Sequence, residues 1–238
     1  MSGGGNGNIA AAGMLVAIGL AVGGYFVGDG LFEARASDRF VTVRGLAERE
    51  APADLVVWPI TYAVTADDLA GLQRRTEESA SKIREFLVND FTEDEISASQ
   101  ARVTDRQAQG VMDQTGRLER YVAQSTVTVR TSRISAARAA MERTGELVGQ
   151  GVALVRSYDA ETEYFFTGLE AVKPEMIREA TQDARRAAQQ FAEDSGARVG
   201  GIRTAQQGYF SINDRDRFSP EHKKIRVVTT VQFFLVDD

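Results

Sequence analysis

Residues 9–27, IAAAGMLVAIGLAVGGYFV, carry no charged side chain, and this run constrains the chain more than any other feature. As a helix it would extend about 28 Å at about 1.5 Å per residue, close to the hydrocarbon thickness of a bilayer. A retained membrane span competes with a signal peptide cleaved after Ala36. Residues 1–8 lack the positive charges of a signal peptide and the run is long, so we favour a membrane helix over residues 9–28.

Glycines within this run are spaced for contact between helices. Gly19 and Gly23 are four residues apart, as are Gly24 and Gly28. Such spacing lets two backbones approach closely in a bilayer, so these four glycines are candidate helix-packing positions. Glycine is also simply common in membrane helices, and that alternative stays open. The lipid bilayer is therefore a predicted partner.

The composition excludes several classes of function. The chain has no cysteine and one histidine, His222, so it can form neither a typical zinc site nor a Cys–His pair. The net charge is −6 without any dense basic run, whereas a nucleic-acid partner requires a basic face, so we expect none. Neither a phosphate-binding G-x-x-x-x-G-K-[ST] loop nor a G-x-S-x-G elbow occurs. We predict a non-enzymatic protein without cofactors.

The rest of the chain divides into a polar connector, residues 29–38, and a folded region, residues 39–238, without a low-complexity linker. Alternating apolar residues predict strands over residues 40–50, 53–65, 96–107, 118–131, 199–212 and 224–236, and over 152–167 with a break near 157–160. Helical periodicity predicts helices over residues 69–89 and 134–148, and from Pro174 to before Gly196. The fold class is α+β, with helices on mainly antiparallel sheets.

The apolar stripes of the two long helices predict their buried faces. The first comprises Leu69, Leu72, Ile83, Phe86 and Leu87, and the second comprises Ile177, Ala180, Ala184, Ala187, Ala188 and Phe191. Pro59 falls inside a predicted strand, which places that position at an edge or a bulge. The order of strands and helices recurs approximately, which predicts an internal duplication with lobes near residues 39–131 and 150–238.

Two groups of side chains are candidates for a site. The carboxylates Glu93, Asp94 and Glu95, with Asp214 and Asp216, would bind a metal only if they converged, and like charges normally stay solvated, so we expect no metal site. Consecutive aromatics in a strand point to both faces, so Tyr164, Phe165 and Phe166 need cover beyond a single core. These three residues are a candidate subunit interface.

Four segments resemble one known family in their order and spacing. Val41-Thr-Val-Arg-Gly45 and Asp54-Leu-Val-Val-Trp58 precede a capped helix, Lys173-Pro-Glu-Met-Ile-Arg-Glu-Ala180 opens an alanine-rich helix, and Lys224-Ile-Arg-Val-Val-Thr-Thr230 ends the pattern. Together they resemble a SIMPL domain over about residues 39–238. The resemblance implies a periplasmic or envelope-associated bacterial protein linked to envelope and oxidative stress, with relatives that form ring-shaped or channel-like homo-oligomers. It provides no catalytic residues.

The orientation of the protein in the membrane is inferred from this resemblance. By the positive-inside rule alone, Arg35 and Arg39 after the span would place the folded region in the cytoplasm. Exported relatives instead imply a single-pass inner-membrane protein with its folded region in the periplasm. The leading hypothesis is a non-catalytic, membrane-anchored protein that assembles into a ring- or cage-like homo-oligomer. The alternative is a monomeric or dimeric binding module for an envelope partner or for a small molecule of unknown identity. An enzyme that uses only carboxylates is a third hypothesis.

Overall fold

The computed structural model describes residues 13–14, 17–26, 39–110, 118–156 and 160–237. Residues 13–14 and 17–26, inside the apolar run, are helical. No helix among the described residues has both the length and the apolar character to cross a bilayer. Gly19, Gly23 and Gly24 lie on the described helical part, whereas Gly28, the tail 1–8 and the connector 29–38 lie outside the described residues.

The folded region consists of two compact units that are interleaved in sequence. Unit 1 comprises residues 1–48, 173–210 and 226–238, and unit 2 comprises residues 49–172 and 211–225. Both are helix-on-sheet structures, and the strand pairings that define their registers are antiparallel, which confirms the predicted α+β class. Each predicted lobe was one continuous stretch of sequence, 39–131 or 150–238, whereas each observed unit combines separate stretches.

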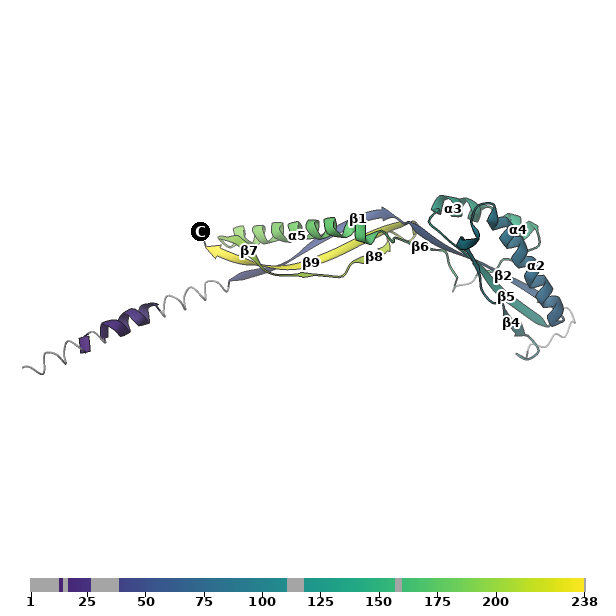
Figure 1. Ribbon diagram of the computed structural model, residues 1–238, viewed down its shortest axis with the longest axis horizontal. Helices are drawn as coiled ribbons and strands as arrows, with labels where there is room; N and C mark the ends of the chain where they lie inside the picture. The colour runs from purple at the N-terminus through teal and green to yellow at the C-terminus, as the bar shows by residue number, and fades with distance from the viewer. Residues whose placement is uncertain (1–12, 15–16, 27–38, 111–117, 157–159, 238) are drawn as a thin grey trace, which may run out of the picture. The chain divides into compact units, whose positions relative to one another are not determined.

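Unit 2 is built on a five-stranded sheet of order β3-β5-β2-β6, with β4 also paired to β5. Its strands are β2 (Leu55–Ala66), β3 (Ile96–Ala98), β4 (Arg102–Asp105), β5 (Tyr121–Thr131) and β6 (Glu163–Phe165). Its helices are α2 (Leu69–Val88), the 3-10 turn η1 (Glu93–Glu95), α3 (Ile134–Glu142) and α4 (Gly145–Gly149). Figure 1 shows α2, α3 and α4 on one face of this sheet.

The core of unit 2 is built on every second residue of β2. Val56, Trp58, Ile60 and Tyr62 are all buried, as the period of a strand requires. They pack against one face of α2 and against buried residues of β5, α3 and α4. Leu69 was predicted to share this face and is 57% exposed. It opens the first turn of α2, just after the Asp68 cap.

Unit 1 has a sheet of order β1-β9-β7, with β8 also paired to β9. The strands of this sheet and its helix are β1 (Phe40–Pro52), α5 (Leu169–Asp194), β7 (Ala197–Gln207), β8 (Ser211–Asp214) and β9 (His222–Asp237). β7 belongs wholly to unit 1 and β8 wholly to unit 2, whereas β1, α5 and β9 have residues in both units. Figure 1 shows α5 lying along one face of the sheet. The buried face of α5 is Met176, Ala180, Ala184, Ala188 and Ala192.

Alanines at every fourth position allow α5 to lie very close to the sheet. A Cβ on Gly45 of β1 would lie 1.8 Å from the Ala180 carbonyl oxygen. The buried face predicted for this helix was partly wrong. Phe191 is 54% exposed and Ala187 is exposed. Because α5 lies so close to the sheet, only its smallest side chains face the sheet. The larger side chains of the predicted apolar stripe have no room there.

Several predicted boundaries differ from the structure. The helix predicted to begin at Pro174 begins at Leu169, with Pro174 inside it. The helix over 134–148 is divided into α3 and α4, and the strand over 96–107 into β3 and β4. Of the described residues in the strand predicted over 152–167, only Glu163–Phe165 form a strand, and Leu154 makes an isolated bridge to Tyr62.

Candidate functional site

A cavity in unit 2 opens along the side of β2 that faces β6. β6 pairs only with residues 55–57 of β2, and further along the Val155 N–H donates to the Thr61 oxygen at 2.8 Å. Pro59 lies between these two pairings and has no N–H to offer a neighbouring strand. The chain therefore leaves the edge of β2 after Val155 and rejoins it at Glu163. Pro59 pairs with Thr128 of β5, and no described residue pairs with it on the opposite side.

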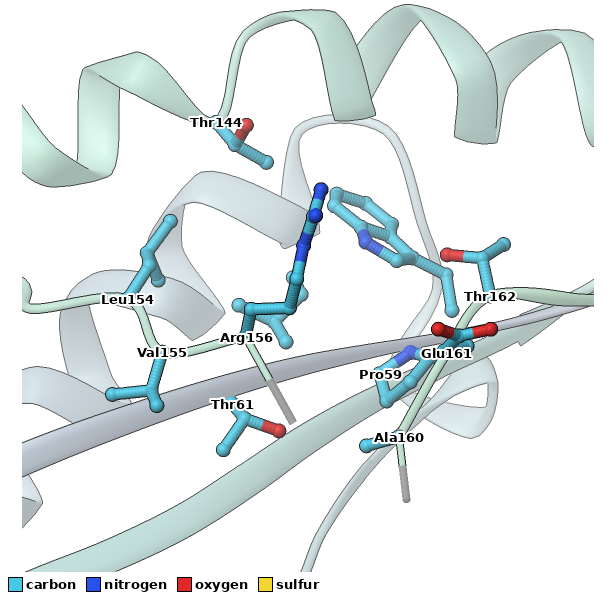
Figure 2. A pocket seen from close by; sticks show the side chains of 11 residues that line it. Pro59, Thr61, Thr144, Leu154, Val155, Arg156, Ala160, Glu161 and Thr162 are labelled. Carbon is cyan, nitrogen blue, oxygen red and sulfur yellow. The ribbon is translucent and has the colours of Figure 1, made fainter. Parts of the chain in front are cut away.

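The resulting pocket has a volume of about 690 Å³ and is lined by β2, the start of α4 and the segments on both sides of residues 157–159. Residues 157–159 themselves lie outside the described residues. Figure 2 shows Arg156 extending into the pocket, with Thr144 on one side and Glu161 on another. Leu154 and the buried Trp58 contribute apolar surface.

Two charged side chains, Arg156 and Glu161, line this pocket. Thr61 already bonds to the Thr126 hydroxyl at 2.9 Å, and the Thr144 hydroxyl donates to the Met141 oxygen at 2.8 Å. Arg156 and Glu161 make no ion pair or hydrogen bond with any described residue. A pocket with separate charges of opposite sign, neither paired with another described residue, is suited to a small molecule that carries both charges.

Four of the five predicted carboxylates, all except Asp94, form ion pairs with neighbouring cations. Asp214 contacts Lys223, Asp216 contacts Arg215, and Glu93 contacts Arg84 at 2.9 Å. Among the described residues, no group of three or more His, Cys, Asp or Glu side chains converges as metal ligands would. These charges therefore serve local structure.

Glu95 is the most strongly perturbed of these carboxylates. Burial alone would raise the pKa of Glu95, but hydrogen bonds from Arg133, Thr131 and Thr92 together outweigh burial and lower the pKa to about 2. Its side chain is 20% exposed and lies in the turn that joins α2 to β3. A carboxylate held in its charged form by three donors is a structural anchor and a poor proton donor.

The predicted aromatic trio lies in and just after β6. Tyr164 packs against the core of unit 2, and burial raises its pKa. Phe165 pairs with Leu55 and is 40% exposed, while Phe166 is half-buried beside Gly168. The trio points to both faces, as predicted for consecutive strand residues, and its role as a subunit interface stays a prediction.

A protein-family model matches residues 41–233, under the description SIMPL, protein of unknown function (DUF541). The chain belongs to the SIMPL family. The match covers nearly all of the folded region and does not include the N-terminal apolar run, which confirms the resemblance inferred from sequence. No curated protein matches the chain.

Two exposed features of this SIMPL domain were missed by sequence reasoning. The loop between β8 and β9 carries Phe218, which is 88% exposed. A second cavity, of about 390 Å³, lies between α2 and β4 and is lined by Leu69, Val103 and neighbouring apolar residues. The hydrophobic periodicity of α2 predicted that Leu69 is part of the core. The sequence carries no signal that Leu69 lines a surface cavity.

Proposed function

We propose that this SIMPL protein is a non-catalytic envelope protein that self-associates into a ring- or cage-like homo-oligomer. A single N-terminal helix over residues 9–28 anchors it in the bacterial inner membrane, with the folded units in the periplasm and a role in envelope stress. The uncharged run and the family resemblance support this placement. Anchoring raises the effective concentration of the copies, so modest contacts between folded units suffice for assembly.

Self-association is supported by two exposed aromatic side chains, each next to backbone that hydrogen bonds hold in place. Tyr209 in unit 1 is 100% exposed and Phe218 in unit 2 is 88% exposed. The backbone beside each is fixed, because the Gly208 N–H donates to the Val228 oxygen at 2.9 Å and the Phe218 N–H donates to Asp216 at 2.8 Å. Aromatic side chains dominate the energetics of protein interfaces and gain most when a partner covers them.

Co-expression of two differently tagged full-length copies tests this proposal. Extraction in mild detergent followed by capture of one tag should recover the other tag in comparable amount. A mixture of separately expressed copies, combined after extraction, controls for association that forms only in detergent. Recovery of a single tag from co-expressed membranes would overturn self-association.

The pocket at the edge of β2 supports a second candidate function, binding of a small zwitterionic molecule. Arg156 would bind its anionic group and Glu161 its cationic group. Trp58, which lines the pocket, is the only tryptophan, so its fluorescence reports occupancy directly. Titration with free amino acids should change this fluorescence, and Arg156→Ala should abolish the change while Arg178→Ala retains it. An unchanged signal over the whole titration would remove this candidate.

A further inference from the structure

The loop between β8 and β9 is a fixed support for one exposed aromatic ring. The Arg215 N–H donates to the His222 oxygen at 2.8 Å, and the His222 N–H donates to the Ser219 oxygen at 3.0 Å. Phe218 projects from this loop with 88% of its surface exposed. Its neighbour Arg217 makes no ion pair or hydrogen bond with any described residue. The loop therefore presents an apolar ring beside an unpaired positive charge.

The cavity between α2 and β4 has the complementary character. Leu69 is 57% exposed and Val103 is 51% exposed, and Leu72 and Ala123 complete its apolar floor. Its volume of about 390 Å³ can admit one aromatic side chain. No lysine or arginine is among its lining residues. Glu77 lies at its rim and is hydrogen-bonded to Gln73, and it pairs with no cation among the described residues. The cavity therefore offers apolar cover beside an unpaired negative charge.

These two features lie at opposite ends of unit 2. The loop is fixed near the start of β2, because the Ala53 N–H donates to the Glu221 oxygen at 2.8 Å. The cavity lies at the other end, where Leu72 packs with Ala66, the last residue of β2. At about 3.3 Å per residue, the strand from Leu55 to Ala66 separates the two features by about 35 Å. One copy therefore cannot fill its own cavity.

We propose that Phe218 of one copy inserts into the α2–β4 cavity of the next copy, with Arg217 beside Glu77. This contact rests on the proposed self-association and names its surfaces. Since the two surfaces differ, the contact is head-to-tail, and repetition of such a contact closes a ring or extends a filament. The contact is small for a free complex, so it depends on the raised concentration that membrane anchoring provides.

The absence of cysteine allows a direct test in the full-length protein. The variant Arg217→Cys/Glu77→Cys retains both Phe218 and the cavity. A disulfide within one copy is excluded by the separation of about 35 Å, since bridged Cα atoms lie within about 7 Å. Mild oxidation in native membranes should therefore give a ladder of covalent multimers. Each single-cysteine variant should stay monomeric on the same gel.

Charge exchange provides a second, independent readout. Arg217→Glu and Glu77→Arg should each reduce recovery in the two-tag capture several-fold, and the two changes together should restore it. Arg178→Glu, at another exposed arginine without a described partner, should have no effect.

Two results would overturn the contact, and the two-tag capture separates them. If both tags are still recovered from the double-cysteine variant but no ladder forms, the copies assemble through other surfaces and only this contact fails. If the wild-type tags are not recovered together and no ladder forms, the proposed self-association fails with it.

Discussion

Gly45 on β1 lies directly beneath α5, at a position that admits no side chain. A Cβ there would meet the Ala180 oxygen at 1.8 Å and the Ala184 nitrogen at 2.4 Å, both backbone atoms that move only with the helix. We expect Gly45→Ala to destabilise unit 1 by about 3 kcal/mol, the upper range for overpacked cores. Hydrogen exchange at the backbone amides of α5 measures this loss.

Gly201→Ala in β7 is the matched control within unit 1, because no atom lies within 4 Å of its added Cβ. Protection of α5 should change little in that variant. Equal loss of protection in both variants would contradict the close approach of α5 to β1.

Glu95 predicts a pH dependence for the stability of unit 2. Its pKa is lowered from 4.5 to about 2, so its contribution is complete above about pH 4.5 and is lost as the pH falls through about 2. The shift corresponds to at most about 3 kcal/mol of unfolding free energy. Urea unfolding followed by Trp58 fluorescence between pH 2 and 7 should show this loss. Glu95→Gln should flatten the dependence in that range, and an unaltered profile would contradict the role of Glu95.

At the scale of elements, α2 begins at a cap that the sequence could predict. Asp68 Oδ1 accepts the Gly71 N–H at 2.8 Å. Asp68→Ala should reduce the unfolding free energy of unit 2 by about 1 kcal/mol, a typical cost for a lost N-cap. Asp67→Ala is the control, since Asp67 is equally exposed and caps nothing. The same urea titrations measure both variants, and equal effects would rule out capping as the cause.

The start of α5 was beyond sequence reasoning, because a distant residue determines it. Asp54 accepts the N–H groups of Thr167 at 2.7 Å and Gly168 at 2.9 Å, just before the helix begins at Leu169. The two partners are separated by 113 residues or more in sequence. Local signals favoured Pro174, since proline suits the first turn of a helix.

The edge of β1 shows a second long-range contact of the same kind. The Leu46 N–H donates to Asp183 of α5 at 2.9 Å, and this hydrogen bond lowers the pKa of Asp183. A strand N–H bonded to a carboxylate is no longer free to pair with another strand.

Pro59 was the only sequence signal that pointed to the candidate pocket. Its charged groups, Arg156 and Glu161, belong to a segment that sequence reasoning assigned to a broken strand.

At the scale of the whole molecule, the local patterns predicted the fold class but could not predict how the chain divides. β1 and β2 are consecutive in sequence, yet they belong to different sheets. The strands β2, β3, β4 and β5 with α2 are therefore inserted between β1 and α5. Hydrophobic periodicity describes one element at a time and does not specify which strands pair.

The glycines of the apolar run predict a contribution of the membrane segment to assembly. Replacing Gly19, Gly23, Gly24 and Gly28 with Leu should keep the run apolar and prevent close approach of two backbones. Recovery in the two-tag capture should then fall several-fold. Gly13→Leu, outside both glycine pairs, is the control. Unchanged recovery in the four-glycine variant would confine assembly to the folded units.

The native mass of the full-length protein tests self-association most directly. The protein is extracted in mild detergent, and light scattering gives its mass after subtraction of the detergent. The account predicts one discrete species many times heavier than the 25.9 kDa chain. A mass that corresponds to one or two copies, and that does not increase as protein concentration rises, would contradict it.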